Sequence, residues 1–459
     1  MMNLIKSAHQ LALGTYINAR MALARDNVYA HIRELNRTQW LPRTEIEQLQ
    51  IKRLKALLLH AEQHCPFYRE RFNAAGFSAE AFTRLSDLEA LPPLTKCEVQ
   101  EHYREMIADT FTPDQMYENH TGGSTGTPLT FYQTPRYKAW GSADIWRNFM
   151  MCGFKMGMRR AFLWGSDYDA KDHKTWFKRT FHDRLRSNQL WINTFDVREA
   201  DLVKAAHQLV RFQPHLLIGY VSSLTLFAQV VRSHKIEGIR PLGIQSSAEI
   251  LTPPQRALIE ETFGAKVFNR YGCREVGNIA HECDHHEGLH LLAETNYTEF
   301  LRDGKPVAPG EEGMITVTNL HNYAMPLIRY QMGDLGRPSD RICSCGRGLP
   351  LMDVVEGRSA DVITTPSGKL LHGEFFTHLF YKLEGVRQFQ VVQETREQLT
   401  VKIEPMSTFH QEEALRFLED TIHQHGDPAF NITFEVVDRI PVSSSGKFRF
   451  TMSRVPLEV

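Results

Sequence analysis

Short apolar runs alternate with helical patterns between residues 201 and 272, and this alternation constrains the fold more than any other feature of the chain. Strands that alternate with helices along a chain pair in parallel, and ligands of such sheets lie at the carboxyl ends of the strands. The sequence therefore predicts an α/β fold with mostly parallel sheets and a site near the turns 246–249 and 271–275. In chain order we expect a helix at 205–212, a strand at 215–219, a helix at 222–234, a strand at 242–247, a helix opened by Pro253 and capped by Thr252, and a strand at 266–272.

Two flanking regions complete the expected large domain. Residues 44–76 have helical spacing, with a break at Pro66, and Thr95 is suited to cap a further helix. Residues 313–335 read as a strand, a turn and a second strand that ends in Gly333-Asp334. An aspartate at a strand end can accept hydrogen bonds from a ribose diol, although the same residue is also common in ordinary turns.

The last hundred residues change character, which indicates a second domain. We expect a small α+β module there, and the joint falls near Gly357-Arg358-Ser359-Ala360-Asp361. The predicted division is a large N-terminal domain at 1–357 and a small C-terminal domain at 358–459. The expected elements of the module are helices at 374–383 and 412–425, a strand pair at 386–392 and 398–403, and a strand at 432–437.

Charge and hydropathy exclude several classes of protein. The 459 residues include 53 Lys and Arg against 54 Asp and Glu, and no basic stripe suggests a nucleic-acid partner. No window is long and apolar enough for a membrane span, and residues 1–24 lack the apolar centre of a signal peptide. We therefore expect a cytoplasmic protein without a membrane anchor, whose seven cysteines are reduced or bind a metal.

The segment Thr121-Gly122-Gly123-Ser124-Thr125-Gly126-Thr127-Pro128 predicts a loop that grips a polyphosphate. Its glycines allow successive N–H groups to turn inward and form an anion nest, and its hydroxyls add donors. Strand-like residues follow at 129–132, so the loop reads as a hairpin tip. Two better-known motifs fit this segment poorly. A P-loop needs Gly-Lys-Ser/Thr and a following helix, whereas Gly126 is followed here by Thr127-Pro128. A serine-hydrolase elbow around Ser124 needs an apolar strand before it and a helix after it, and neither pattern is present. The remaining alternative is a glycine-rich surface turn.

Three cysteines and a histidine suggest a closed, structural zinc site. Cys343 and Cys345 form a tight pair, and Cys283 and His290 stand upstream. His285 or His286 could replace His290, and buried reduced cysteines without metal are a further alternative. Residues 281–285 also match the His-Glu-x-x-His motif of zinc proteases, but Gly288 and the strand-like residues 289–292 argue against the long helix that this motif requires.

Five elements in one order resemble the adenylate-forming superfamily of acyl-CoA synthetases and adenylation domains. The cysteine elements and the short N-terminal region resemble its phenylacetate–CoA ligase branch. The resemblance covers residues from about 50 to 459 and implies two steps. A carboxylate attacks the α-phosphate of ATP and gives an acyl-adenylate, and a thiol, usually that of coenzyme A, then displaces AMP. The elements are the loop 121–128, Tyr271-Gly272-x-x-Glu275, Arg329-Tyr330-x-x-Gly333-Asp334, Gly357-Arg358-x-x-Asp361 and Gly446-Lys447-x-Arg449.

The resemblance implies a role for each matching position. Lys447 would bridge the carboxylate and the α-phosphate from a mobile C-terminal lid domain, and Glu275 would bind Mg²⁺. Lys447, Glu275 and Thr125 are the expected catalytic residues, and the same four ligands, Cys283, His290, Cys343 and Cys345, occur as a metal set in the branch. The ATP-binding positions are Thr121, Gly122, Gly123, Ser124, Thr125, Gly126 and Thr127 for the phosphates, Ser247, Ala248, Tyr271 and Gly272 for adenine and the acyl pocket, and Asp334 with Arg358 for ribose.

One departure from the family pattern concerns the joint between the domains. Many relatives have an acidic hinge residue two positions after the arginine, whereas this chain has Ala360 there and Asp361 next. The resemblance implies a small carboxylic acid, ATP, Mg²⁺ and coenzyme A as ligands, and a dimer is typical of the branch. The acid is not readable, and an amine or a carrier protein is the alternative acceptor. A binding protein without activity is disfavoured, because Glu275, Asp334 and Lys447 are all present.

Overall fold

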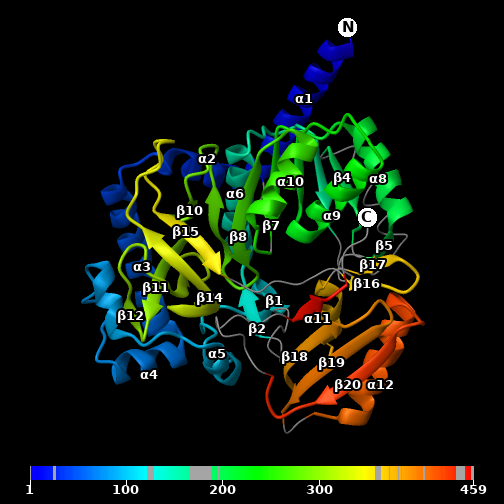
Figure 1. Cartoon of the computed structure of the whole chain (residues 1–459). Coiled ribbons are helices and arrows are strands. Elements are labelled where there is room, and N and C mark those ends of the chain that lie inside the picture. The colour runs from blue at the N-terminus through cyan, green and yellow to red at the C-terminus, as the bar shows by residue number, and fades with distance from the viewer. Residues whose placement is uncertain are drawn as a thin grey trace.

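A 12-stranded sheet forms the centre of the molecule in the computed structural model. Its strands follow the order β12-β11-β13-β14-β15-β10-β9-β8-β7-β6-β3-β4 (Figure 1). The structure describes residues 2–23, 27–120, 129–164, 188–194, 196–247, 249–356, 363–371, 373–380, 382–383, 385–406, 409–440 and 450–455.

One half of this sheet is parallel, as the helix–strand alternation predicts. β3, β4, β6 and β7 pair in parallel, and β7 pairs in parallel with the start of β8. Helices α8, α9 and α10 contribute apolar side chains to one core with these strands, and α6 contributes to another. The bounds are β3 Arg160–Leu163, β4 Gln189–Ile192, β6 Leu216–Tyr220, β7 Gly243–Ser247, β8 Val267–Cys273, α6 Pro135–Met151, α8 Glu199–Phe212, α9 Val221–Ser233 and α10 Pro253–Phe263.

The other half of the sheet is antiparallel and begins where β8 pairs with β9. Its core also takes side chains from α3, α4 and the segment that follows, so the helices expected at 44–76 are confirmed. Thr95 caps α5 in a reciprocal capping box with Glu98, as expected. The bounds are α3 Arg43–His64, α4 Pro66–Ala74, η1 Leu85–Ala90, α5 Lys96–His102, η2 Pro113–Gln115, β9 Gly277–Glu282, β10 Leu289–Leu291, β11 Asn296–Arg302, β12 Lys305–Pro306, β13 Gly313–Asn319, β14 Tyr330–Ser339 and β15 Leu351–Glu356.

The position of Asp334 differs from the sequence prediction. β14 does not end at Asp334 but continues to Ser339. The pairing of β13 with β14 shifts register between Met314 and Thr316, and Gly333 opposite this shift has a φ of 78°. The expected strand end is therefore a bulge, and a bulge re-aims a side chain within a continuing strand.

A short antiparallel hairpin flanks the glycine-rich loop. β1 (Tyr117–His120) pairs with β2 (Thr130–Gln133), and His120 lies opposite Thr130. The intervening residues 121–128 lie outside the described part of the chain. A strand that pairs back on its predecessor is incompatible with the helix that both a P-loop and a nucleophile elbow require after the loop. The hairpin prediction is confirmed for the two flanks.

The C-terminal module contains a separate four-stranded sheet with the order β20-β19-β18-β21. The expected strand pair and helices are present, but β20 pairs in parallel with β19, and β21 was not predicted. A three-stranded sheet, β16-β17-β5, joins this module to residues 196–198 of the larger part. The bounds are β5 Asp196–Arg198, β16 Ile363–Thr364, β17 Lys369–Leu371, α11 Glu374–Phe380, β18 Val386–Gln393, β19 Gln398–Pro405, α12 Gln411–Thr421, η3 Ile422–Gly426, β20 Asn431–Val436 and β21 Thr451–Ser453.

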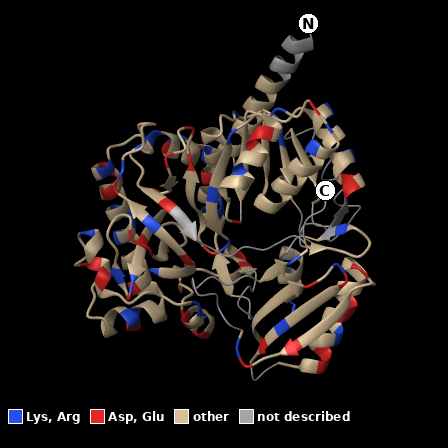
Figure 2. Ribbon diagram, in the orientation of Figure 1, with Lys and Arg blue, Asp and Glu red and all other residues tan. Residues whose placement is uncertain are grey.

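The N-terminus forms a helix that sequence patterning did not indicate. α1 (Met2–Ala22) projects from the body in Figure 1, and α2 (Val28–Thr38) packs against α6. Figure 2 shows acidic and basic residues interspersed along the ribbon. None of the helices in the described part of the chain combines the length and the apolar character that a membrane span requires.

Candidate functional site

Polar side chains gather at the carboxyl ends of the parallel strands, where the fold class places ligands. Ser247 ends β7 and is buried, and Arg270 lies near the end of the neighbouring β8. The Nη1 of Arg270 donates a hydrogen bond of 2.6 Å to the Ser247 Oγ. Burial lowers the pKa of the Arg270 guanidinium. Ala248, the next predicted contact, lies outside the described residues.

Tyr271 and Asp334 meet although 63 positions separate them in the chain. The hydroxyl of Tyr271 donates to the Asp334 Oδ2 at 2.8 Å. Tyr271 comes from β8 and Asp334 from the bulge in β14, so the curved sheet and the bulge together bring an aromatic ring beside a carboxylate. Both side chains are half-buried, which leaves part of each accessible to a ligand.

The turn that carries Glu275 is fixed beside the hairpin of the glycine-rich loop. Gln133 of β2 donates through Nε2 to the carbonyl oxygen of Arg274 at 3.1 Å, and the hydroxyl of Tyr137 lies 3.4 Å from the carbonyl oxygen of Glu275. The Glu275 side chain is half-exposed. A Cβ on Gly272 would stand only 2.5 Å from the Gly277 carbonyl oxygen, so this close turn requires glycine.

Several predicted site residues cannot be located. Thr121, Gly122, Gly123, Ser124, Thr125, Gly126 and Thr127, together with Ala248, Arg358, the hinge position Ala360, and Lys447, lie outside the described residues. The described partners of the site are therefore Ser247, Tyr271, Gly272, Glu275 and Asp334. Among these, Tyr271 and Asp334 are in direct contact.

The four predicted metal ligands lie together. The ligand atoms of Cys283, His290, Cys343 and Cys345 are all within 4.8 Å of one another. The Cys283 and Cys343 sulfurs are 3.6 Å apart, and the Cys345 sulfur is 3.5 Å from the His290 Nε2. Ligands of a tetrahedral zinc, at about 2.3 Å for sulfur and about 2.0 Å for nitrogen, stand roughly 3.5–3.8 Å apart.

Burial raises the pKa of the Cys283 thiol, and backbone N–H donors offset part of this effect there and help to lower the pKa of Cys345. The N–H of His285 points to the Cys283 sulfur and that of Arg347 to the Cys345 sulfur, each at 3.4 Å. Such bonds stabilise the charged form that binds a metal. Burial lowers the pKa of His290 to about 4, so the imidazole is neutral and its nitrogen is available as a ligand.

The alternative histidine ligands and the zinc-protease motif do not fit the structure. His285 hydrogen-bonds the Ser344 hydroxyl at 2.6 Å, and His286 contacts Glu282, so neither replaces His290. Glu282, which would be the base of a zinc protease, instead accepts hydrogen bonds from the Nη2 of Arg256 on both of its oxygens. His281 lies on the strand β9 instead of the helix that the protease motif needs.

The cysteine–histidine cluster is remote from the Glu275 turn. Cys283 follows the end of β9, whereas the start of β9 pairs with Gly272 and Cys273. β9 has six residues, which span roughly 20 Å at about 3.3 Å per residue. A metal held by the cluster would therefore stabilise the loops after β9 and before β15 and would not touch the Tyr271–Asp334 pair.

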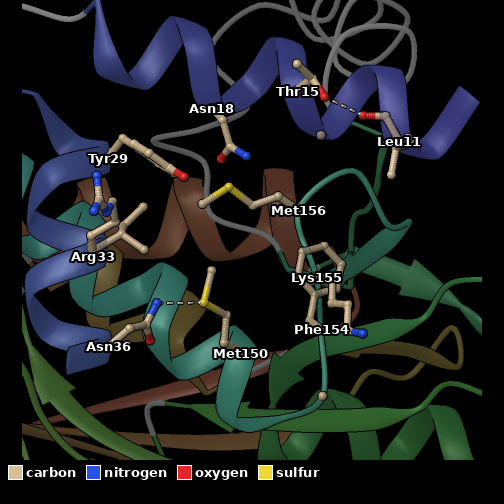
Figure 3. A pocket seen from close by; sticks show the side chains of 13 residues that line it. Leu11, Thr15, Asn18, Tyr29, Arg33, Asn36, Met150, Phe154, Lys155 and Met156 are labelled. Atoms are coloured by element: carbon tan, nitrogen blue, oxygen red, sulfur yellow. Dashed lines mark hydrogen bonds between the residues drawn. The ribbon is translucent and has the colours of Figure 1, made fainter.

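Two pockets lie elsewhere on the molecule. One, of about 540 Å³, lies between α1, α2 and the end of α6, where Asn36 contacts the Met150 sulfur (Figure 3). The other, of about 750 Å³, is lined by residues of α4, η1 and α5. Neither pocket shares a lining residue with the predicted site.

Comparison with known proteins agrees with this arrangement. The family model described as the CapK C-terminal domain matches residues 363–454. Phenylacetate–coenzyme A ligase of Escherichia coli is 29% identical over 78% of this chain and 82% of its own length, and that of Thermus thermophilus is 24% identical over 83% and 86%. A solved 2-hydroxyisobutyryl-CoA ligase, in complex with 2-HIB-AMP and CoA, has a TM-score of 0.64 at 20% identity over 91% of this chain and 92% of that one.

The fold thus has the architecture of the adenylate-forming ligases. In sequence, the chain is similar to phenylacetate–coenzyme A ligases over most of its length.

Three described residues of the site were missed by the sequence interpretation. Gln133 and Tyr137 position the Glu275 turn, and nothing in their local sequence distinguishes them. Arg270 could have been found, because it is the single charged residue of β8 and this strand ends at the predicted ligand side of the sheet.

Proposed function

We propose that the chain is an ATP-dependent acid–thiol ligase that adenylates a carboxylate and transfers the acyl or aryl group to coenzyme A. The observation that carries this proposal is the contact between Tyr271 and Asp334. These two residues come from separate motifs of the superfamily, which assign adenine to one and ribose to the other. Their contact at 2.8 Å supports one nucleotide site built from both motifs.

The first step joins a carboxylate oxygen to the α-phosphorus and releases pyrophosphate. The face of Tyr271 holds adenine, Asp334 accepts hydrogen bonds from the ribose hydroxyls, and the loop 121–127 donates to the β- and γ-phosphates. Glu275 is a half-exposed carboxylate and fits the oxygen preference of Mg²⁺, which neutralises phosphate charge when it is bound. Lys447 adds a compact positive charge between the two reacting anions.

The second step replaces AMP by a thiol at the acyl carbon. The thiolate sulfur bonds to this carbon, the bond between the carbon and the AMP oxygen breaks, and the thiol proton goes to solvent. We place the division between the domains at 357/358, so that the module 358–459 can bring Lys447 to the first step and remove it for the second. The matched module at 363–454 supports this division.

ATP–pyrophosphate exchange tests the proposed function. We expect purified protein with Mg²⁺ to exchange labelled pyrophosphate into ATP in the presence of one class of aryl or aliphatic acid. Glu275→Gln should lower this exchange by about 10²–10³-fold, because the carboxylate that fits Mg²⁺ becomes neutral. Adding coenzyme A should then yield a thioester. Exchange that leaves no thioester with coenzyme A would instead favour an amine or a carrier protein as acceptor. The absence of exchange with every acid would contradict the proposal.

We also propose that the cluster of Cys283, His290, Cys343 and Cys345 binds a structural zinc ion. The spacing of the donor atoms and the two backbone N–H donors support this assignment. Such a site is closed, since all four positions are taken by the protein. It would tie the loop after β9 to the loop between β14 and β15.

Metal removal should act on stability and not directly on chemistry. We expect elemental mass spectrometry of the purified protein to find about one zinc ion per chain. Cys343→Ser should abolish this and lower the melting temperature by about 5–10 °C, because several kcal/mol of metal binding are lost. Cys97→Ser is the control, because Cys97 is exposed and lies outside the cluster. A wild-type protein that stays fully folded after removal of the zinc, yet loses ATP–pyrophosphate exchange when Mg²⁺ is supplied, would contradict a structural role.

A further inference from the structure

Arg270 is a half-buried cation held by neutral groups. Its Nη1 donates to the Ser247 Oγ at 2.6 Å, and its Nε donates to the Asn278 Oδ1. β7, β8 and β9 each supply one member of this set. The guanidinium is therefore fixed at the carboxyl ends of adjacent strands, one residue before Tyr271.

No carboxylate of the described residues pairs with Arg270, and this separates it from comparable arginines. Arg147 contacts Asp144 and Glu294, Arg256 contacts Glu282, and Arg329 contacts Glu299. The acid that acts on Arg270 from a distance is Asp144, which already accepts a hydrogen bond from Arg147. A charge that is withdrawn from water without a partner is costly, so proteins keep such groups for ligands.

The guanidinium has donors left for a ligand. It carries five N–H groups, and its described hydrogen bonds use one on Nε and one on Nη1. The remaining N–H groups include both on Nη2, and together with the second one on Nη1 they form the planar fork that matches a carboxylate. Ser247 and Asn278 fix the orientation of this fork without neutralising its charge.

Arg270 points to the opposite face of β8 from Tyr271, the proposed adenine contact. Successive side chains of a strand point to opposite faces, and Tyr271 uses its face to reach Asp334. Arg270 shares its face with Phe268, which packs in the core that includes Trp140 and Trp146 of α6. The fork therefore lies on the α6 side of the sheet, on the opposite face of β8 from Tyr271.

We propose that Arg270 binds a second carboxylate of the acid substrate, so that the chain acts on dicarboxylic acids. One carboxylate reacts at the α-phosphorus, and the other remains ionised and paired with the guanidinium. This inference rests on the proposed function for the identity of the reacting carboxylate. It names a substrate class that the motifs of the chain leave open.

Calorimetry on the full chain tests the inference without relying on turnover. The probes are dicarboxylic acids of about four to eight carbons, together with 4-carboxyphenylacetate, each paired with the monoacid in which a methyl group replaces one carboxylate. They are titrated in the presence of Mg²⁺ and α,β-methylene-ATP. We expect at least one diacid to bind about 10- to 100-fold more tightly than its monoacid, as a bidentate charged pair allows. Equal affinities across all pairs would overturn the inference.

Variants assign the preference to Arg270. Arg270→Met should remove it, and Arg270→Lys should retain only part of it because lysine lacks the fork. Asn278→Asp keeps Arg270 but gives it an internal carboxylate, so this variant should also lose the preference even if Arg270→Met folds poorly. Arg232→Met, which removes an exposed arginine of α9, should leave the preference unchanged. The inference would be overturned if Asn278→Asp and Arg270→Lys both kept the wild-type ratio of diacid affinity to monoacid affinity.

Two further outcomes separate this inference from the proposed function. If Arg270→Met weakens α,β-methylene-ATP or the monoacids as much as the diacids, Arg270 binds phosphate or the reacting carboxylate, and the inference is wrong. If diacids bind selectively but no acid supports pyrophosphate exchange, the inference stands and the proposed adenylation fails. If monoacids and diacids support pyrophosphate exchange equally well, the proposed adenylation stands and the inference about Arg270 is wrong.

Discussion

Replacing Arg329 by methionine is expected to destabilise the protein by about 3–5 kcal/mol, a large share of the stability of a typical domain. Arg329 is fully buried and forms a two-pronged pair with Glu299, at 3.1 Å from Nε to Oε2 and 2.9 Å from Nη2 to Oε1. Its Nη1 also donates to the carbonyl oxygens of Leu88 and Leu91. The substitution leaves a buried carboxylate and two carbonyl oxygens without these donors.

Urea unfolding followed by tryptophan fluorescence measures this effect. Arg302→Met is the matched control, because Arg302 is 57% exposed and its carboxylate partner Glu311 is 3.7 Å away, so its loss should change the stability by less than about 0.5 kcal/mol. The double variant Arg329→Met/Glu299→Leu should recover part of the loss, since it removes the unpaired charge. An Arg329→Met protein with the wild-type unfolding midpoint would show that the pair contributes little.

The structure assigns Arg329 a different place from its motif partner Asp334. Sequence comparison groups the two residues in one motif, which suggests a shared role in ligand binding. Arg329 is buried in the core and attaches η1 to the sheet through the Leu88 carbonyl oxygen, whereas Asp334 is half-buried and contacts Tyr271. One motif can thus combine a buried residue that holds a strand in place with a second residue that the same strand directs into the site.

The parallel half of the fold could be predicted because each of its elements is short, regular and bounded by clear turn residues. The run 201–272 gave the correct order of helices and strands, since buried parallel strands read as continuous apolar segments. The four side chains of the cysteine–histidine cluster lie together as expected, because three cysteines and a histidine form a donor set suited to one tetrahedral metal, and their role as metal ligands stays a prediction.

Other parts depend on contacts between distant residues and were not readable. The bulge at Gly333-Asp334 is an offset of register, which leaves the local strand pattern unchanged. The parallel addition of β20 and the strand β21 are set by partners in the C-terminal sheet. The position of Arg270 depends on Ser247 and Asn278, which only the folded sheet brings to it.

Lys447→Ala is expected to lower ATP–pyrophosphate exchange by about 10²–10³-fold and to leave thiolysis of a supplied acyl-adenylate within about threefold of wild type. The reason is electrostatic. Two anions, the carboxylate and the triphosphate, must approach before any bond forms, and a lysine between them offsets their repulsion. The second step has no such approach, because the adenylate has already lost pyrophosphate and the thiol is a single nucleophile.

The control for this prediction is Lys402→Ala, which removes another lysine of the same module. Lys402 lies on β19 and its ammonium is 3.5 Å from Glu435, so the variant tests whether any loss of charge in the module affects exchange. We expect both half-reactions to be unchanged in Lys402→Ala. If Lys447→Ala instead slows both steps by the same factor, the lysine contributes to binding of the common AMP portion, and the module need not move between the steps. If the two steps separate as expected, Lys447 contributes its charge to the first step alone, and thiolysis proceeds without it.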